Sequence, residues 1–563
     1  MRFLTAAVLF VIALALGLVG VAQQTIWLPP KAHVLTLESA GTEPLVLVSH
    51  GALTMYPGSP AIEVTGSDNI FLATGRQADV AAWIGQTNHR LVTAHANQLV
   101  EKAANGGGLL ANPTGSDLWR MERKAQTSLQ QILDVSQDGA LLIASDGLTP
   151  APSSIKLTWE IPFDPTWSRI LIYTGLGFLA LAIAVNIWAW YTMRKERGPR
   201  RRTPKAPRGP KYRYRSSKPN APVRGRRSAR NAKLAIAATV SVALLAGCSS
   251  ATPSQTPTPS ASATENLQPA VVTSVQLGRI VHRIAAVVQR ADKAKDGKQL
   301  ISRVTGPALN ARQAHYVLQG LGDKIKPLPA INADQISFIL PAATTAWPRT
   351  VMAVAAAKSA ADLPQMLVLE QEGPRSPYTL WYVIDMLPGV QTPEVAAADL
   401  GAIPVAADSK FLKLSPNALP TAFGNLIDMG SASLSATSFD LSNDEFYKQV
   451  ASAQAQQISS LKNAKLTVTH SLGNANVLSL STANSGALVA VYMLDTYIIK
   501  PTKANAAVAV SGNEKLLLGS TGSTSGVRSV YGDMLLFYVP AVSSKDRIVT
   551  LGATQGLLSV RSL

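Results

Sequence analysis

The chain has 563 residues, of which 47% are hydrophobic and 15% are charged, so it is more apolar than an ordinary soluble protein. This length predicts several domains, and this composition predicts membrane segments. The formal net charge is +18, and the single cysteine, Cys248, excludes an internal disulfide and any metal site built on cysteines.

Residues 1–22 predict a transmembrane helix or a signal peptide. Arg2 precedes about twenty apolar residues, which are enough to cross roughly 30 Å of hydrocarbon as a helix. The small residues Gly20 and Ala22 also suit cleavage by a signal peptidase after Ala22. We favour retention of this helix, and both alternatives place the next residues on the same side of the membrane.

Residues 23–168 predict a mainly β domain, a small sandwich. Short alternating runs such as "HVLTLE", "PLVLVS" and "SIKLTWE" are separated by turn sequences such as "YPGSP" and "NGGG". Two short helices are also expected, one in "QADVAAWIG" and one in "LWRMERKAQTSLQQIL".

Residues 169–193 predict a second transmembrane helix, with aromatic residues at both of its ends, where they suit the membrane interface. Seventeen Lys and Arg residues lie between Arg194 and Lys233, against one acidic residue, Glu196. Residues 23–168 instead carry eight basic and thirteen acidic residues. The positive-inside rule therefore places residues 194–233 in the cytoplasm and residues 23–168 on the extracytoplasmic side.

The basic segment, residues 194–233, is rich in Pro, Gly and Ser and predicts a disordered cytoplasmic segment. It acts either as an extended stop-transfer signal or as a segment attracted to anionic lipid of the inner leaflet. No folded nucleic-acid-binding module accompanies the charge, so we expect no nucleic-acid partner.

Residues 234–248 have the order of parts found in a lipoprotein signal. A basic region ends at Lys233, a fourteen-residue apolar region runs from Leu234 to Gly247, and Cys248 follows. Leu245-Ala246-Gly247-Cys248 resembles the lipobox of bacterial lipoproteins, which implies lipidation of the Cys248 thiol and cleavage before it. The Ser/Thr/Pro-rich residues 249–267 resemble the tether that follows such a signal.

The position of this signal inside the chain departs from the lipoprotein pattern, in which the signal is N-terminal. Two explanations stay open. Either the second span delivers the chain to the cytoplasm and the internal signal enters the membrane again, or two adjacent genes have been joined or read as one.

Residues 268–405 and 406–563 predict two tandem α+β units, each with a helix followed by an antiparallel sheet. A helix in "VQLGRIVHRIAAVVQRADKA" opens the first unit, and Ser442 and Glu445 predict a capping box for a helix in the second. The order of elements resembles the cystatin-like and nuclear-transport-factor-two-like class, in which a curved sheet cups a helix.

The sequence shows few residues that could carry chemistry. Its seven histidines occur singly and without ligand spacing, so we expect no metal and no cofactor. Asp385, Asp495 and Asp533 lie in apolar strands and are candidates for a buried catalytic carboxylate or a local structural pair. Aromatic residues could line a ligand cavity in the cones or simply pack in the core: Trp381, Tyr382, Tyr492, Tyr497, Phe537 and Tyr538.

Segments such as "YGDMLLFYVPA" and "IASDGLTPAPSSIKLTW", together with the order of parts, resemble uncharacterised actinobacterial envelope proteins. The resulting hypothesis is a non-enzymatic, multi-pass protein of the bacterial cell membrane, a scaffold or accessory subunit. It would present extracytoplasmic domains to an envelope protein partner or to the cell wall, with membrane lipid as a further partner. One alternative is a lipoprotein that binds a lipid or another hydrophobic ligand, and a weaker one is an envelope hydrolase with convergent carboxylates in one cleft.

Overall fold

The structure, a computed structural model, describes residues 2–27, 30–135, 138–161, 166–196, 270–360 and 362–563. These form two units: residues 1–29 with 163–265, and residues 30–162 with 266–563. The predictions for most of the basic segment, for Leu245, Ala246, Gly247 and Cys248, and for the tether lie outside the described residues.

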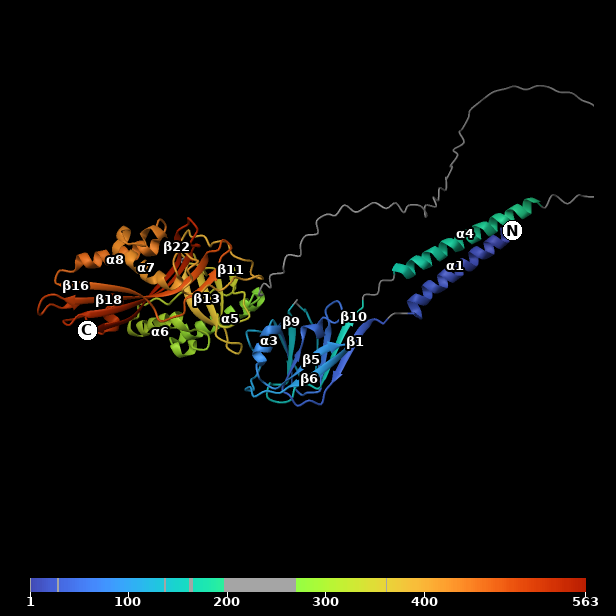
Figure 1. The fold of residues 1–563 in the computed structure, drawn as a ribbon, viewed down its shortest axis with the longest axis horizontal. Coiled ribbons are helices and arrows are strands. Elements are labelled where there is room, and N and C mark those ends of the chain that lie inside the picture. Colours follow the sequence, from blue (N-terminus) through green and yellow to red (C-terminus); the bar gives the residue numbers. More distant parts are fainter. Residues whose placement is uncertain (1, 28–29, 136–137, 162–165, 197–269, 361) are drawn as a thin grey trace, which may run out of the picture. The chain divides into compact units, whose positions relative to one another are not determined.

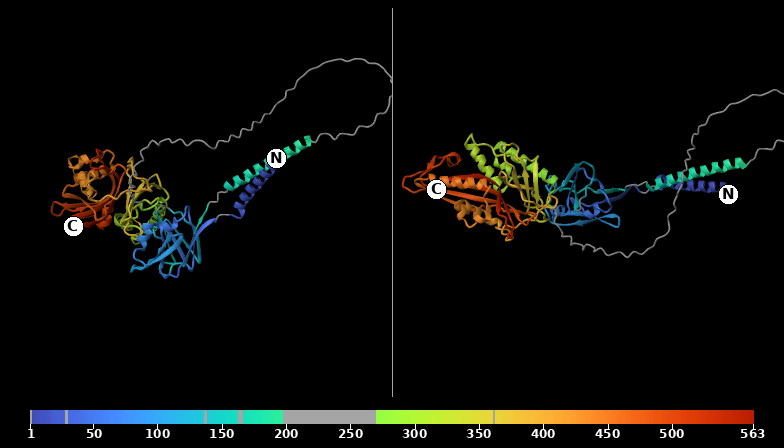
Figure 2. Two further views of the ribbon diagram at one scale, coloured as in Figure 1. Left: turned by 45° about the vertical axis from the view of Figure 1, so that its right-hand side comes forward. Right: turned by 90° about the horizontal axis from the view of Figure 1, so that it is seen from above.

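Two helices, α1 (Arg2–Thr25) and α4 (Thr166–Glu196), form the described part of the first unit (Figure 1). Their segments Phe3–Thr25 and Thr166–Lys195 are long and apolar enough to cross a membrane. The views in Figure 2 agree that the helices lie side by side.

The two helices pack antiparallel through small residues. Gly20 lies against Ser168 and Ile172, while Gly175 lies so close to Gly17 that an added Cβ would come within 3.1 Å of the Gly17 nitrogen. Small residues recur at seven-residue spacing along α4, at Ser168, Gly175, Ala182 and Ala189. Such spacing lets the backbones of two membrane helices approach closely, so α1 is a packing partner of α4.

The N-terminal domain, residues 30–162, is a sandwich of two sheets, which confirms the mainly β prediction. One sheet is antiparallel and has the order β1 (Ala32–Glu38), β10 (Ser154–Glu160), β3 (Ala61–Thr65), β8 (Ser128–Ile132). The other is mixed and has the order β6 (Gln98–Ala104), β5 (His89–His95), β2 (Leu45–Val48), β9 (Gly139–Ala144), β4 (Ile70–Arg76), β7 (Met121–Ala125). The short helices are α2 (His50–Leu53) and α3 (Gln77–Ile84).

Alternating apolar residues build this sandwich. Ile62, Leu157 and Trp159 of one sheet share a core with Val46 and Ile143 of the other. The opposite face of the mixed sheet packs against α3 in a second cluster.

The helix expected in "LWRMERKAQTSLQQIL" is wrong. The segment forms β7 and β8, joined by a turn in which Thr127 has a φ of 54°. Because β7 pairs with β4 and β8 pairs with β3, the segment crosses from one sheet to the other. Strand pairing over long sequence separations overrides the local helix preference.

The C-terminal domain begins with α5 (Ser274–Ala294), a 3-10 turn (Gly297–Leu300) and α6 (Gly306–Leu321). An antiparallel sheet follows, in the order β11 (Ile336–Pro341), β12 (Arg349–Ala355), β13 (Gln365–Gln371), β14 (Thr379–Asp385). Thr273 and Gln276 form a capping box at the start of α5, and Leu277, Ile280, Ile284 and Val288 bury one face of that helix.

The second half contains α7 (Leu419–Met429), α8 (Glu445–Ser460) and α9 (Gly512–Leu518). Three short 3-10 turns flank α7: Pro416–Ala418, Gly430–Ala432 and Ala436–Ser438. The sheet order is β15 (Phe439–Asp440), β22 (Ile548–Ser562), β21 (Val527–Val539), β18 (Ala487–Pro501), β16 (Ala464–Leu472). In addition β17 (Leu478–Ser481) pairs with β18, and β19 (Val508–Ala509) pairs with β20 (Gly522–Ser523).

The expected capping box at Ser442 and Glu445 is wrong. The N-cap of α8 is Asp444, whose carboxylate accepts a hydrogen bond from the Tyr447 nitrogen at 2.8 Å. Ser442 instead donates its hydroxyl to Asp440 at 2.6 Å. A carboxylate one residue before the helix satisfies the free N–H groups of the first turn directly.

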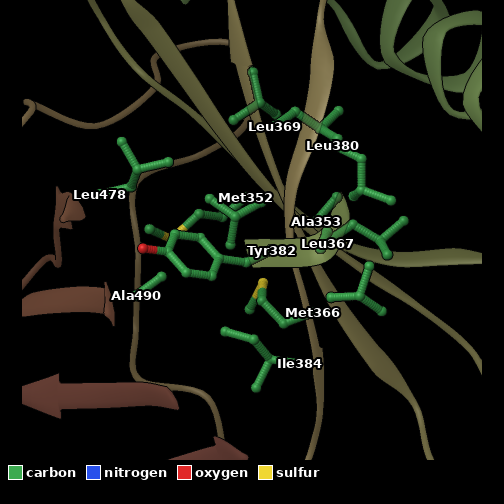
Figure 3. Close-up of a cluster of buried hydrophobic side chains, with 14 of the residues drawn as sticks. Met352, Ala353, Met366, Leu367, Leu369, Leu380, Tyr382, Ile384, Leu478 and Ala490 are labelled. Carbon is green, nitrogen blue, oxygen red and sulfur yellow. The ribbon is translucent and has the colours of Figure 1, made fainter. Parts of the chain in front are cut away.

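The two α+β units share one core and are stacked sheet on sheet. All seven residues of β12 and of β13 are buried, so both faces of the first sheet are covered. Tyr382 points from this sheet toward Leu478 and Ala490 of the second sheet (Figure 3), and its hydroxyl donates to the Asn476 carbonyl at 2.6 Å. The other face of the second sheet packs against α7 and α8 around Phe423. The layers are therefore α5, first sheet, second sheet, and α7 with α8.

Candidate functional site

Buried ion pairs join the N-terminal domain to the C-terminal domain, and Asp79 on α3 is the first centre of this joint. Its carboxylate accepts two hydrogen bonds from Arg76, each at 2.8 Å, and one from Arg349 of β12 at 2.7 Å. Side-chain exposures of the three residues are 3% or less. Arg76 also donates to the carbonyls of Ala270 and Thr344. One buried carboxylate is therefore shared by two buried guanidinium groups, one from each domain.

Asp117 is the second centre of the joint, and its side chain has no exposed surface. It accepts hydrogen bonds from Arg283 of α5 at 2.9 Å, from the Tyr378 backbone nitrogen at 2.9 Å, and from Arg303. Gln276 of α5 donates to the neighbouring Leu118 carbonyl at 3.0 Å. A carboxylate that accepts several charge-assisted bonds is held tightly in one geometry.

Arg375 forms the third part of the joint by capping the C-terminal end of α3. It donates to the carbonyls of Trp83 at 2.8 Å and Ile84 at 3.1 Å, and to the Thr87 hydroxyl at 2.8 Å. A cation at a helix C-terminus meets the free carbonyls and the negative end of the helix dipole. Trp347 adds apolar contact, because it packs against the cluster on the outer face of the mixed sheet.

A second polar cluster, the acid network, lies between the second sheet and its helices. His470 of β16 binds Asp495 of β18 through Nδ1 at 2.6 Å and Asp428 of α7 through Nε2 at 3.3 Å. Gln454 of α8 donates to Asp428 at 2.6 Å, and Gln555 of β22 donates to Asp533 of β21 at 3.4 Å. Asp495 and Asp533 have no exposed surface.

The acid network raises the pKa of two of its side chains, Asp533 and His470. Burial raises the pKa of Asp533 well above its usual range, and the charge of Asp495 and the hydrogen bond with it raise this pKa further. The folded protein therefore favours the protonated form of Asp533 more strongly than the unfolded chain does. Burial opposes the charged form of His470, but the hydrogen bond and charge of Asp495, with a smaller effect of Asp428, raise the pKa of this imidazole above its usual value.

A groove with two chambers runs between the helices and the sheets of the C-terminal domain. The first chamber, about 200 Å³, is mainly apolar and lies between α6, β14, β21 and β22. The second chamber, about 460 Å³, is more polar and lies beside α8. Four residues line both chambers, so the two form one groove: Leu328, Asp385, Thr554 and Gln555.

A comparison with protein families identifies the family of the C-terminal domain. A model described as "Domain of unknown function (DUF8094)" matches residues 268–559, which are more than half of the chain. The chain belongs to this family. No curated protein and no solved structure matches the chain. The DUF8094 match covers both α+β units, in agreement with their shared core.

In the joint, the DUF8094 domain contributes mainly arginines, among them Arg283, Arg303, Arg349 and Arg375, and the N-terminal domain contributes both central carboxylates. The sequence did not predict this joint. The only local signal is Asp79, a charged residue on the apolar face of a short helix, and its partner Arg349 lies 270 residues away.

The structure separates the three candidate carboxylates. Asp495 and Asp533 lie in the acid network, while Asp385 lies at the junction of the groove, where Gln365 donates to it at 3.2 Å and burial raises its pKa. His470 was assigned no role from sequence, and it connects Asp428 to Asp495.

Most of the candidate aromatic residues are core residues. Tyr382 and Tyr492 lie in the core between the two sheets, Phe537 packs against α7, and Tyr538 and Trp381 pack at the margin of the first core. Tyr497 alone of the six lines the groove. Tyr531 was not among the predicted residues, and its ring meets that of Tyr497 edge to face at a centroid distance of 5.5 Å.

Proposed function

We propose that the chain is a membrane-anchored scaffold of the cell envelope, in which the N-terminal domain and the DUF8094 domain are locked into one extracytoplasmic body. The joint at Asp79 and Asp117 is the observation that carries the proposal. Taking these charges out of water is costly, and in the joint each central carboxylate meets arginines of the DUF8094 domain, so the pairs specify one docked arrangement.

The docked body constrains the path of the chain. The N-terminal domain lies between α1 and α4, whereas the DUF8094 domain follows α4 in sequence. If α4 crosses the membrane once, the chain has to cross again before residue 270 for the two domains to meet on one side. Residues 234–247 are the long apolar run in that interval. This requirement supports an internal export signal, lipidation of Cys248, or joining of two proteins that form a complex.

The packing of α1 against α4 supports retention of α1 as an anchor. A cleaved signal peptide would leave the small-residue face of α4, including Gly175, without its partner. The scaffold would then be held by two helices and, after lipidation, by a lipid on Cys248. We propose an envelope protein or the cell wall as the partner that this body meets.

The sole cysteine makes a direct test of sidedness feasible. Single cysteines are introduced at Asn69 in the N-terminal domain, at Ser520 in the DUF8094 domain and at Ser216 in the basic segment. Intact host cells are then treated with a membrane-impermeant maleimide. We expect labelling at Asn69→Cys and Ser520→Cys, and none at Ser216→Cys before the cells are lysed. Wild type, with Cys248 alone, is the reference.

Labelling of Asn69→Cys without Ser520→Cys would place the two domains on opposite sides and refute the proposal. A labelled Ser216→Cys in intact cells would refute the cytoplasmic placement of the basic segment.

A second function, ligand binding, is favoured by the groove. The hydrolase alternative has less support, because of the three candidate carboxylates only Asp385 lines the groove, while Asp495 and Asp533 are fully buried. Gln555 lines the groove and donates to Asp533, whose own carboxyl group does not line it.

A further inference from the structure

From the chemistry of its two chambers, we infer that the groove binds an alkylammonium group, with the apolar tail in the first chamber and the cationic amine in the second. This inference deepens the ligand-binding function and does not depend on the anchoring proposal. Together the chambers have the size range of small-molecule sites.

The first chamber suits an apolar tail. Its walls are built mostly from alkyl side chains, including Leu318, Leu328, Val383, Met534 and Leu557. The one arginine in its lining, Arg312, is buried and paired with Asp292 at 2.7 Å, so its charge is already satisfied. Burial lowers the pKa of His315, which therefore lines this chamber as a neutral ring at pH 7. An alkyl chain gains free energy by leaving water here.

The second chamber presents acceptors and negative charge. Its described lining contains the carboxylates Asp385 and Glu514 and no lysine, arginine or histidine. Behind it lies the acid network, with the carboxyl groups of Asp428, Asp495 and Asp533. An anionic head would be repelled from this chamber, whereas a cation would be attracted.

An unsatisfied acceptor in the chamber wall gives independent support for a donor ligand. Gln454 is 92% buried and lines the second chamber, yet its Oε1 accepts no hydrogen bond among the described residues. Its Nε2 is fixed on Asp428 at 2.6 Å, so the amide cannot turn without losing that bond. A buried acceptor without a donor costs about 1–3 kcal/mol, and an N–H group from a ligand relieves this cost.

Two tyrosines complete a site for a cation. Tyr497 and Tyr531 both line the second chamber, with an angle of 75° between their rings. The Tyr531 hydroxyl donates to Glu514 at 3.1 Å, which fixes the ring beside the carboxylate. Aromatic faces next to a carboxylate attract organic ammonium groups, because the ring quadrupole adds to the charge.

The test uses three soluble probes with the same tail: hexylammonium, hexanol and hexanoate. Each is titrated by calorimetry into the full-length protein in lipid nanodiscs, with empty nanodiscs as the blank. We expect hexylammonium to bind most tightly and hexanoate most weakly. Dihexanoyl phosphatidylethanolamine, titrated in the same way, distinguishes an amino-lipid headgroup from a free amine as the source of the ammonium group.

Two variants and a control connect the binding to the groove. Glu514→Gln should weaken hexylammonium about fivefold and leave hexanol unchanged, since it removes charge and keeps shape. Ala311→Phe should fill the first chamber and weaken all probes. Glu445→Gln, an exposed residue of α8 that pairs with Lys448 at 2.8 Å, is the matched control and should have no effect.

Equal affinity for the three probes, tighter binding of hexanoate, or no binding at all would overturn the inference. Binding of hexylammonium that is unchanged in both Glu514→Gln and Ala311→Phe would place the amine elsewhere and would also overturn it. None of these results depends on which side of the membrane the domains occupy, so this inference and the anchoring proposal fail separately.

Discussion

Replacing Asp79 by alanine is the sharpest perturbation of the joint. The substitution removes three hydrogen bonds of 2.7–2.8 Å and leaves Arg76 and Arg349 buried without their shared counter-charge. Removal of one partner of a buried pair costs about 3–5 kcal/mol. Since each 1.4 kcal/mol is a factor of about ten, the docking equilibrium should fall by about two to three and a half powers of ten.

Hydrogen exchange and calorimetry measure this loss. In wild type we expect one unfolding transition for the two domains, with slow exchange in α3. In Asp79→Ala we expect fast exchange in α3 and at the start of β12, and two separate transitions. Arg349→Met removes the contact from the DUF8094 side, so it should expose the same two segments. The same response in both variants would show that the domains have undocked, because Arg349→Met does not alter α3 itself.

Lys156→Ala is the control for the loss of an ion pair. Lys156 pairs with Glu63 at 3.0 Å, but the two side chains are 44% and 34% exposed, so the change should cost less than about 1 kcal/mol. If Asp79→Ala and Arg349→Met show the same unfolding transition and the same hydrogen exchange as Lys156→Ala, the joint does not hold the domains together. That result would refute the prediction.

Three further predictions concern other parts of the chain. Cys248→Ala should abolish a lipid-bearing product that begins at residue 248, as measured by intact mass in the host; an identical mass pattern in both proteins contradicts the lipobox. Gly175→Leu should abolish in-cell crosslinking between α1 and α4, whereas Gly177→Leu, whose added Cβ would meet no atom within 4 Å, should not; equal loss in both variants would contradict the packing. The folded state binds a proton at Asp533 more tightly than the unfolded state does, so the stability that this proton contributes should decline as pH rises above about 4 toward the raised pKa. The pKa of His470 is also raised, so the stability that its proton contributes should likewise decline as pH rises above about 6.5. Asp533→Asn should flatten this dependence and raise the melting temperature at pH 8 relative to wild type, and an unchanged pH profile would count against the buried proton.

The sequence predicted elements well where the signal is local. The apolar lengths of residues 1–22 and 169–193 predicted the two long helices, and alternating patterns predicted the β-rich domains. The sequence-based prediction failed where a strand pairs with a segment that is distant in the chain. The segment with β7 and β8 carries helix-forming residues, yet β7 pairs with β4 and β8 with β3.

The candidate site was predicted only in part. Asp495 and Asp533 were chosen because a carboxylate among apolar residues is unusual, and both are buried in the acid network. Their partner His470 lies on the same face of its strand as Leu466 and Val468, a local signal from which no role was predicted. It becomes important only because β16 pairs with β18 and places it opposite Asp495.

By itself, the sequence determined the two apolar helices, the β-rich character of the domains and the lipobox pattern, since each depends on composition or on spacing within a few residues. Only the tertiary structure decided that the two α+β units share one core, that arginines of the DUF8094 domain bind Asp79 and Asp117, and that a groove with two chambers opens beside the acid network. Those features join residues that lie between about 25 and 290 positions apart. Ion pairing and burial are set by which surfaces meet, and the local pattern around one residue does not contain that information.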